Sequence, residues 1–423
     1  MQPLPRQRLR KAQIAMLLTF IFMGHAALAS VAWVPEYIAR LDVSFAVWGT
    51  IIGLGVIGSI TPLFFASRLM MRFGSRPLIR FANYGGMIAL VSLGLTTDPA
   101  LWFFINMAFN FCMSLLGVSV NSHAVLLQKK ISKNIIGRMH AGWSIGAVLA
   151  AFTGGLATVF LPLEVFLVLV AVLTLIIFEF SLRWLMSPDE DGHQEEKAGV
   201  VKRRFYQMPS QLWLLAFGLF CGIYPEVAII DWAAVFARDI LNADVALRSV
   251  PFATFMVGMI AGRLSMTRMA EHYHPQLIAS RGSFMAALAL ALTAIFAPII
   301  TDASPMLGLT TASLLWGVAG FGLSSVSPAF FSAAGHVPGV STAWAVSRLS
   351  LFNSMVSIGA KTMMGALTEE VGLSLAFFFP ISLAIGAGLI AGLFASRARR
   401  SELDSAAPPT GPISIIVPPE GDR

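Results

Sequence analysis

The chain has 423 residues, of which 57%, about 241, are hydrophobic and only 12% are charged. Soluble domains carry roughly 45–50% apolar and ~25% charged residues, so this composition excludes an ordinary soluble enzyme. The mean hydropathy of +0.76 agrees. The net charge of +7 does not indicate nucleic-acid binding, because the sequence offers no polar face on which a basic groove could form.

Twelve apolar runs follow one another along the chain, each bounded by charged residues, proline or glycine. A membrane-spanning helix needs ~20 predominantly apolar residues, and these runs supply them. They cover residues 12–34, 46–67, 78–97, 100–127, 139–160, 162–184, 211–235, 249–270, 277–299, 305–333, 342–367 and 371–395. The first run is long for the apolar region of a cleaved signal peptide, so we count it as a helix. The sequence predicts an all-α, polytopic membrane protein with twelve transmembrane helices.

Lysine and arginine concentrate in alternate connections between the runs and near both ends of the chain. The positive-inside rule places such segments in the cytoplasm, so both termini are predicted to be cytoplasmic. A charged stretch after the sixth run divides the twelve runs into two sets of six. The predicted organisation is a cytoplasmic N-terminus over residues 1–11, a six-helix bundle over 12–186, a cytoplasmic linker over 187–210, a second six-helix bundle over 211–395 and a disordered cytoplasmic tail over 396–423.

The two sets of runs repeat each other at an offset of 200 residues. Gly58, Ser67, Arg68 and Phe73 correspond to Gly258, Thr267, Arg268 and Tyr273. An offset that skips six helices preserves the direction of each helix, so the halves are parallel repeats about an axis normal to the membrane. This arrangement places a central cavity between two six-helix bundles.

The division into six and six spans and the basic loop after span 2 resemble the major facilitator superfamily over residues 12–395. The loop signature of that family resembles Ser67-x-Leu69-x-Met71-Arg72-x-Gly74-Ser75-Arg76, although Ser67 replaces the usual glycine. Met71 replaces the usual aspartate, so the carboxylate that latches the two halves is missing. In the repeat copy Glu271 falls at the acidic position. The resemblance implies a gating loop made of Arg68, Arg72, Gly74, Arg76 and Glu271.

A narrower resemblance is to the YbjJ-like subgroup of bacterial inner-membrane proteins, which is distantly similar to fucose permease. The residues that carry it are Asn121, His140, Glu226, Asp231-Trp232 and Phe331-Ser332-Ala333-Ala334-Gly335. It implies a multi-pass protein of the bacterial inner membrane in which spans 1, 4, 7 and 10 line the cavity. The subgroup often has an aspartate in span 4, where this chain has Gly117.

Polar side chains recur at helical spacing in two of the predicted spans. Span 4 carries Asn106, Asn110, Ser114, Gly117 and Asn121, and span 11 carries Ser350, Asn353, Ser357 and Lys361. Such stripes either line a cavity or let neighbouring helices approach and hydrogen-bond, and both readings stay open. The substrate-binding candidates are His25, Asn106, Asn110, Asn121, Trp232, Trp316, Asn353 and Lys361.

Two carboxylates lie inside span 7, where an ionised side chain costs about 2.5–3.5 kcal/mol at the helix centre. Glu226 and Asp231 are ~140° apart around the helix, so they need different partners. Lys361 is predicted to pair with one of them. Both are candidates for proton coupling, and Glu226 is favoured because Pro225 loosens the helix beside it. The alternative is a carboxylate hydrogen-bonded inside the bundle.

These features favour a secondary active transporter rather than an enzyme. We expect it to move a small polar solute, a sugar or an organic acid, by alternating access with proton coupling. Proton-coupled efflux of drugs or metabolites and a non-transporting membrane sensor or scaffold are the alternatives. The predicted partners are the solute, protons and the lipid bilayer, and the predicted oligomeric state is a monomer. There is no P-loop, and Cys112 and Cys221 lie in apolar runs, so we expect no cofactor, disulfide or metal site.

Overall fold

A computed structural model describes residues 5–131, 135–187, 190 and 208–406. Its regular elements are all helical in this part of the chain. The N-terminal half contains α1 (Arg6–Leu28), η1 (Val31–Trp33), α2 (Val34–Leu41), α3 (Phe45–Ile60), η2 (Thr61–Phe64), α4 (Ala66–Phe73), α5 (Ser75–Leu95), α6 (Pro99–Ile131), α7 (Ile136–Phe160) and α8 (Leu163–Trp184). The C-terminal half contains α10 (Ser210–Asp239), η5 (Val245–Leu247), α11 (Val250–Met269), α12 (Pro275–Ala303), α13 (Pro305–Leu323), α14 (Val326–Gly335), α15 (Thr342–Val371), α16 (Leu373–Ala376) and α17 (Phe378–Ala406).

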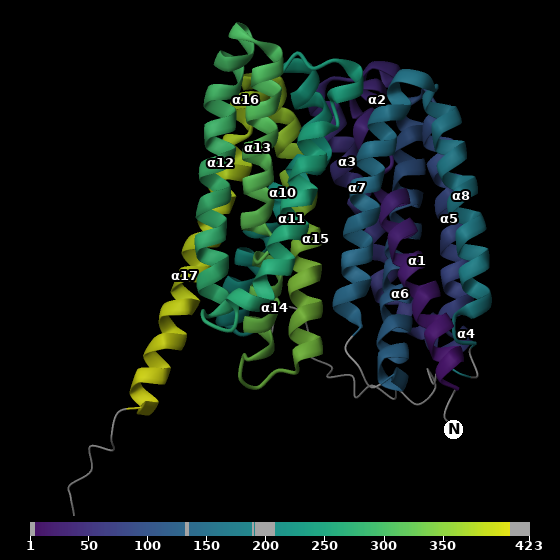
Figure 1. The fold of residues 1–423 in the computed structure, drawn as a ribbon, viewed down its shortest axis with the longest axis vertical. Coiled ribbons are helices and arrows are strands. Elements are labelled where there is room, and N and C mark those ends of the chain that lie inside the picture. The colour runs from purple at the N-terminus through teal and green to yellow at the C-terminus, as the bar shows by residue number, and fades with distance from the viewer. Residues whose placement is uncertain (1–4, 132–134, 188–189, 191–207, 407–423) are drawn as a thin grey trace, which may run out of the picture.

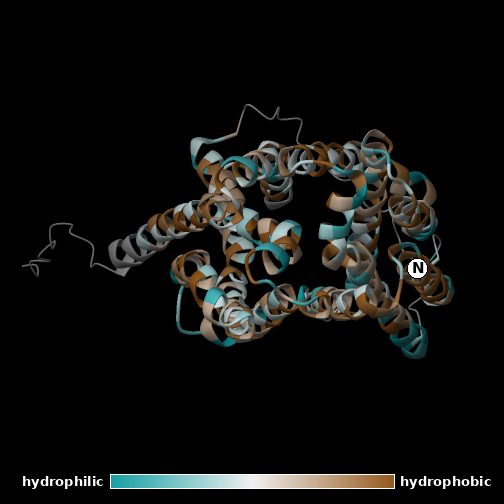
Figure 2. Cartoon of the chain, turned by 90° about the horizontal axis from the view of Figure 1, so that it is seen from above, coloured by the Kyte–Doolittle hydropathy of each residue, from teal (hydrophilic) through white to brown (hydrophobic). Residues whose placement is uncertain are grey.

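The helices form two bundles that lie side by side, one from each half of the chain (Figures 1 and 2). Large apolar side chains are exposed on the outer faces of both. Phe81, Phe152 and Leu314, for example, are 65%, 66% and 67% exposed. Surfaces of this kind are stable against lipid rather than water, which agrees with helices long enough to cross a membrane.

Eleven helical segments in the described residues are both long and apolar enough to span a bilayer. The remaining predicted span, the eleventh in chain order, corresponds to α15, which is 30 residues long but is not among the eleven that are apolar enough. Lys361 and the polar residues of its stripe account for this difference. Hydropathy alone therefore does not identify α15 as a membrane span, whereas its length and its position in the bundle do.

The predicted repeat has a direct counterpart in the packing. Gly58 lies against the backbone carbonyl of Met107 in α6, and Gly258 lies against that of Gly317 in α13. The second helix of each half thus touches the fourth span of the same half at an equivalent glycine. Close backbone approach of this kind requires a residue without a side chain.

Several of the predicted spans are interrupted, the first and the tenth among them, which the apolar runs do not reveal. The first breaks between α1 and α2, with Pro35 at the start of the second segment. The tenth breaks at Ser324 and Ser325, whose hydroxyls donate to the carbonyl oxygens of Phe321 and Gly322. Pro328 follows in the first turn of α14, and proline disfavours a continuous helix through the preceding turn.

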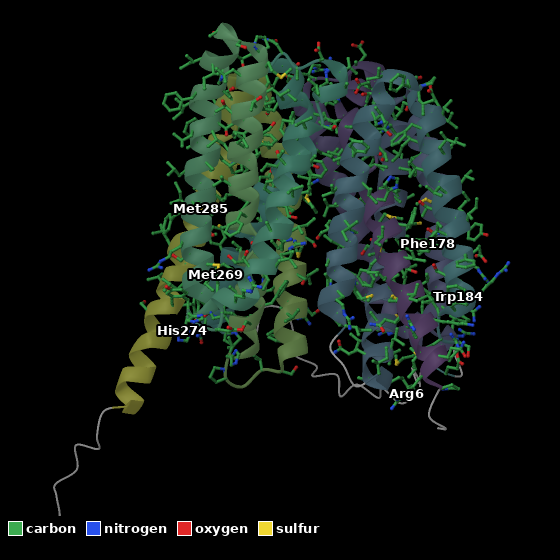
Figure 3. The ribbon with its side chains drawn as sticks, in the orientation of Figure 1. Arg6, Phe178, Trp184, Met269, His274 and Met285 are labelled. Carbon is green, nitrogen blue, oxygen red and sulfur yellow. The ribbon has the colours of Figure 1, made fainter. Side chains whose placement is uncertain are left out.

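The terminal helices extend into the segments that the sequence assigns to the N-terminus and the tail. Helix α1 begins at Arg6, inside the segment assigned to the cytoplasmic N-terminus, because Arg8 donates to the carbonyl oxygens of Trp184 and Leu185 and pairs with Glu190 at 2.6 Å. Figure 3 shows Arg6 and Trp184 at this same end of the molecule. Helix α17 continues to Ala406, beyond the predicted start of a disordered tail. Residues 407–423 and most of the predicted linker lie outside the described residues.

The two bundles meet at the end of the molecule opposite the N-terminus, where α3 crosses α15 (Figure 1). An added Cβ at Gly49 would lie 2.7 Å from the Gly365 Cα and 2.8 Å from the Lys361 carbonyl oxygen. A hydrogen bond of 2.9 Å from the Phe45 amide to Glu369 Oε2 also joins the halves here. We call this contact between α3 and α15 the interbundle seal.

A methyl group at Gly365 is expected to open the interbundle seal. Its Cβ would lie 2.5 Å from the Phe45 carbonyl oxygen, and overpacking of this kind costs about 1–3 kcal/mol. Gly365→Ala is therefore expected to raise the labelling rate of a cysteine placed at Ile52, behind the seal, roughly fivefold or more. Gly359→Ala on the same helix is the matched control, since its Cβ meets nothing within 4 Å. Equal labelling in the two variants would show that the glycine contact does not hold this end closed.

Candidate functional site

A cavity of about 870 Å³ lies between the two bundles. Helices α1, α6 and α7 line it from the N-terminal half, and α10, α11, α13 and α14 line it from the C-terminal half. We call it the central cavity. Its lining residues include Phe20, Met23, Asn121, Arg138, His140, Trp143, Ser144, Glu226, Met259, Arg263, Ser324, Ser327 and Phe331. Arg138, at the start of α7, is exposed, so the cavity extends toward the end that carries the N-terminus.

Some of the polar groups of the central cavity form a cluster that crosses from one bundle to the other. The Arg263 guanidinium of α11 donates through Nη1 to Ser144 Oγ of α7 at 2.7 Å. Ser144 in turn donates to the His140 carbonyl oxygen at 3.2 Å. Arg263 also lies close enough to interact electrostatically with Glu226 and His140. Residues of the two halves thus share one hydrogen-bonded network.

Glu226 enters this cavity from α10, which continues through Pro225 without a break. Proline has no N–H to donate to the carbonyl of the preceding turn, so the helix backbone is weakened beside the carboxylate. Among the residues that the structure describes, Glu226 has no direct ion pair or hydrogen bond. Of the two carboxylates in span 7, Glu226 is therefore the one that does not pair with Lys361.

Lys361 pairs with Asp231, one of the two carboxylates that the sequence left open as its partner, and Glu226 takes no part in the pair. Lys361 Nζ lies 2.7 Å from Asp231 Oδ2 and 3.0 Å from Oδ1. The side chains are only 15% and 13% exposed. The pair lines a smaller cavity of about 230 Å³ beneath the interbundle seal, together with Asn106 and Asn110. We call this the outer cavity, and Ala27 lines both it and the central cavity.

A family model described as the Major Facilitator Superfamily matches residues 16–360. The chain belongs to this superfamily. Major facilitator proteins are membrane transporters and not enzymes, so the class predicted from the sequence is confirmed at that level.

Two curated bacterial proteins that are similar to this chain are both named as transporters. An uncharacterized transporter of Sinorhizobium fredii, y4wD, is 26% identical over 369 residues, which is 86% of this chain and 90% of that protein. An uncharacterized major facilitator transporter of Yersinia pestis is 24% identical over 371 residues, which is 86% of this chain and 91% of the relative.

Solved structures of this superfamily show the same fold. A mutant of the nucleoside transporter NupG superposes with a TM-score of 0.71 at 14% identity, over 92% of this chain and 99% of that one. A bacterial homologue of the human lysosomal transporter Spinster, in an inward-facing and occupied conformation, gives a TM-score of 0.63 at 16% identity, over 97% and 100%. At these identities the likeness concerns the fold alone.

The predicted substrate-binding residues of this major facilitator chain separate into distinct places. Asn121 lines the central cavity, while Asn106, Asn110 and Lys361 line the outer cavity. Ser114 lies between the two asparagine groups and donates to the Ser59 carbonyl oxygen at 2.6 Å. The stripe on α6 therefore lines cavities at both ends and packs against α3 in its middle, so each of the two sequence readings holds for part of it.

Four other candidates lie away from the central cavity. Trp232 is fully buried and meets Phe45 edge-on at 5.8 Å beside the interbundle seal. Trp316 is fully buried between Phe236 and Phe377 in the core of the C-terminal bundle. Asn353 lines neither cavity. His25 bonds to Thr153 at 3.0 Å and lines a separate apolar pocket between α1, α7 and α8.

The predicted gating loop lies at the end of the molecule that carries the N-terminus. Gly74 adopts a φ of 77° between α4 and α5, a conformation that favours glycine. The Arg72 guanidinium lies 5.1 Å from the centre of the Phe73 ring. Arg68 and Glu271 lie on the corresponding stretches of the two halves, and Arg76 is the second residue of α5. The central-cavity lining includes none of these five residues.

Arg263 and Ser144 are the site residues that the sequence reasoning missed. Arg263 lies within the eighth predicted span, so its charge was as informative as that of Glu226. The repeat match of this span rests on Gly258, Thr267 and Arg268 and does not single out Arg263. Ser144 carries no comparable signal, since a serine within a span is common and only its position opposite Arg263 gives it meaning.

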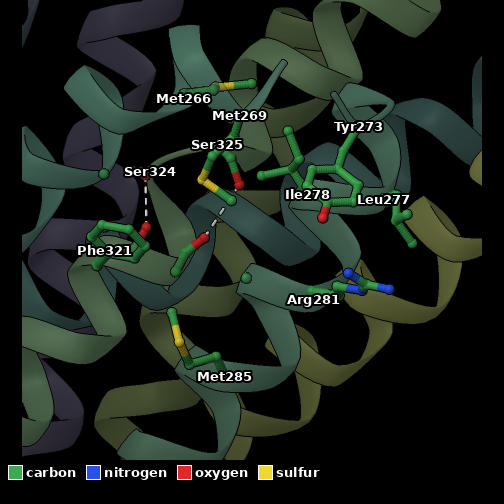
Figure 4. A pocket seen from close by; sticks show the side chains of 13 residues that line it. Met266, Met269, Tyr273, Leu277, Ile278, Arg281, Met285, Phe321, Ser324 and Ser325 are labelled. Atoms are coloured by element: carbon green, nitrogen blue, oxygen red, sulfur yellow. Dashed lines mark hydrogen bonds between the residues drawn. The ribbon is translucent and has the colours of Figure 1, made fainter. Parts of the chain in front are cut away.

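A further cavity of about 240 Å³ lies within the C-terminal bundle, between α11, α12 and the break between α13 and α14 (Figure 4). Its lining is mostly apolar and includes Met266, Met269 and Met285. Its one charged lining residue, Arg281, stacks over Tyr273 at 5.9 Å. A polar solute therefore has fewer partners here than in the central cavity.

Proposed function

We propose that the protein is a secondary active transporter that moves a small polar solute by alternating access, coupled to protons. The observation that carries the proposal is the central cavity between two repeat bundles, which contact each other through the interbundle seal and through the packing of α7 against α11. A cavity of about 870 Å³ accommodates a small organic molecule. Rocking of the two bundles would expose the cavity alternately to the two sides of the membrane.

Glu226 is the proposed proton carrier. It faces the central cavity without a direct ion pair among the described residues, whereas Asp231 is neutralised by Lys361 at 2.7 Å. Protonating an unpaired carboxylate removes the cost of about 2.5–3.5 kcal/mol that a charge carries near the bilayer centre. Binding of a proton and binding of the solute would then both favour the same rocking movement of the two bundles.

The alternatives from the sequence fare differently. A non-transporting sensor or scaffold requires a packed centre, which the central cavity disfavours. Efflux of drugs or metabolites is favoured by the apolar side chains Phe20, Trp143 and Phe331 among the lining residues. It differs from uptake in the direction of solute movement and not in the site.

Our proposal also includes the cellular setting. We place the protein as a monomer in the bacterial inner membrane with both termini in the cytoplasm, as the basic connections suggest. The state described would then be open to the cytoplasm. The residues around Asn121, Glu226 and Asp231 support membership of the YbjJ-like subgroup and a distant relation to fucose permease.

A ligand screen on the purified protein, followed by transport of each ligand found, tests the proposal. Thermal unfolding at two pH values would identify ligands, which would then be supplied to proteoliposomes with an imposed proton gradient. We expect accumulation against the solute gradient. Ligands that bind but cross the membrane in neither direction would contradict the transport function.

A further inference from the structure

The charges of the central cavity do not balance. Arg138 and Arg263 supply two positive charges, and Glu226 supplies one negative charge when it is ionised. His140 is the only other titratable side chain in the lining, and it adds positive charge when protonated. Lys361 and Asp231 neutralise each other in the outer cavity and leave this balance unchanged. The cavity is therefore positively charged, and it becomes more so when Glu226 takes up a proton.

Arg263 is the cation best placed to bind a ligand. A guanidinium carries five N–H donors in a planar fork. Among the described residues, only Ser144 Oγ, at 2.7 Å from Nη1, accepts a hydrogen bond from it. The remaining donors suit the two oxygens of a carboxylate, which arginine binds in a bidentate manner. Because Ser144 belongs to the opposite bundle, a ligand at Arg263 lies between the two moving halves.

The rest of the lining indicates what the anionic group is attached to. Phe20, Met23, Trp143, Met259 and Phe331 surround the polar cluster with aromatic and methionine side chains. Such surfaces bind an apolar body by burying its surface from water. A highly hydroxylated sugar would leave many hydroxyl groups without partners against them.

We propose that Arg263 binds the transported solute, that this solute is a carboxylate with an apolar body, and that Glu226 competes with it for Arg263. An ionised Glu226 is attracted to the Arg263 guanidinium and so weakens binding of the solute there. A protonated Glu226 is neutral and leaves the guanidinium available to the carboxylate of the solute. One proton on Glu226 therefore accompanies each bound carboxylate. This inference rests on the proposed transport function and names its substrate class.

Matched pairs of ligands test the inference. The probes are benzoate, phenylacetate, 3-phenylpropionate and 1-naphthoate, each with its neutral amide, titrated calorimetrically into the purified full-length protein at pH 5.5 and 7.5. We expect at least one carboxylate to bind tenfold more tightly than its amide. If no carboxylate is preferred over its amide, the inference is overturned without recourse to any variant.

Four variants, one of them a control, assign the preference to residues. Arg263→Gln is expected to abolish the preference for the carboxylate, and Arg263→Lys to weaken it by retaining the charge without the planar fork. Arg281→Gln, in the separate cavity of the C-terminal bundle, is the matched control and should preserve it. Glu226→Gln should bind the carboxylate at pH 7.5 as tightly as the wild type does at pH 5.5. If folded Arg263→Gln still binds the carboxylate more tightly than its amide, Arg263 is not the residue that binds the carboxylate.

The two proposals fail in different ways. Proton-driven transport of an amide or an ammonium compound, without binding of any carboxylate, would leave the transport function intact and overturn the substrate class. Binding of carboxylates that depends on Arg263, without transport in proteoliposomes, would support the substrate class and contradict the transport function.

Discussion

Replacing Lys361 by methionine is expected to destabilise the folded protein by about 3–5 kcal/mol. Asp231 would then be left as an unpaired charge that is only 13% exposed. Removing one partner of a buried ion pair has a cost of this size, whereas replacing both partners by neutral groups is often close to neutral. Lys361→Met combined with Asp231→Asn is therefore expected to recover most of the lost stability.

The measurement is thermal unfolding of the purified variants, together with the amount of folded protein in the membrane. Lys11→Met is the matched control, since Lys11 is exposed near the start of α1. If the double variant is as unstable as the single one, the role assigned to the pair is incorrect. If the double variant is stable but does not transport, the pair is needed for function as well as for folding.

The second large effect concerns Glu226. In Glu226→Gln, accumulation driven by a proton gradient is expected to vanish while exchange of internal for external solute continues. A carboxylate carried with one proton is driven by the pH difference alone, which limits its accumulation to about tenfold for each pH unit. The glutamine of the variant neither binds nor releases a proton, so the accumulation ratio at an imposed pH difference should fall to one.

Proteoliposomes with an imposed pH difference and with preloaded solute distinguish these two activities. Glu370→Gln provides a control, because Glu370 is an exposed carboxylate at the end of α15 and lies outside both cavities. Accumulation in Glu226→Gln that still follows the pH difference would place the proton at another residue. His140 would then be the next candidate, as it lies in the same cluster.

The sequence predicted the helices and their repeat well, because both follow from composition along one dimension. Twelve apolar runs correspond to the long helices, and Gly58 and Gly258 occupy equivalent contacts in the two halves. The interruptions at Ser324 and near Trp33 escaped prediction. Breaks within an apolar run arise from local backbone bonding, which hydropathy does not register.

The site was predicted less completely, for a physical reason. Helical spacing shows which residues share a face but does not show which helix that face meets. The pairing of Lys361 with either Asp231 or Glu226 was predictable because buried charges need partners of opposite sign. Trp316 and His25 had no such constraint, and both lie away from the central cavity. Arg263 acquires its role only through Ser144 on the other bundle.

Alternating access is the central claim, and distances across both ends of the molecule test it directly. Spin labels at Asp98 and Asp302 would report the end with the interbundle seal, and labels at Met71 and His272 would report the opposite end. All four residues are exposed, and each pair joins the two bundles. The account predicts that a transported ligand lengthens the first distance in a fraction of the molecules and shortens the second in the same fraction. Distances that stay fixed, or that change in the same direction, would contradict it.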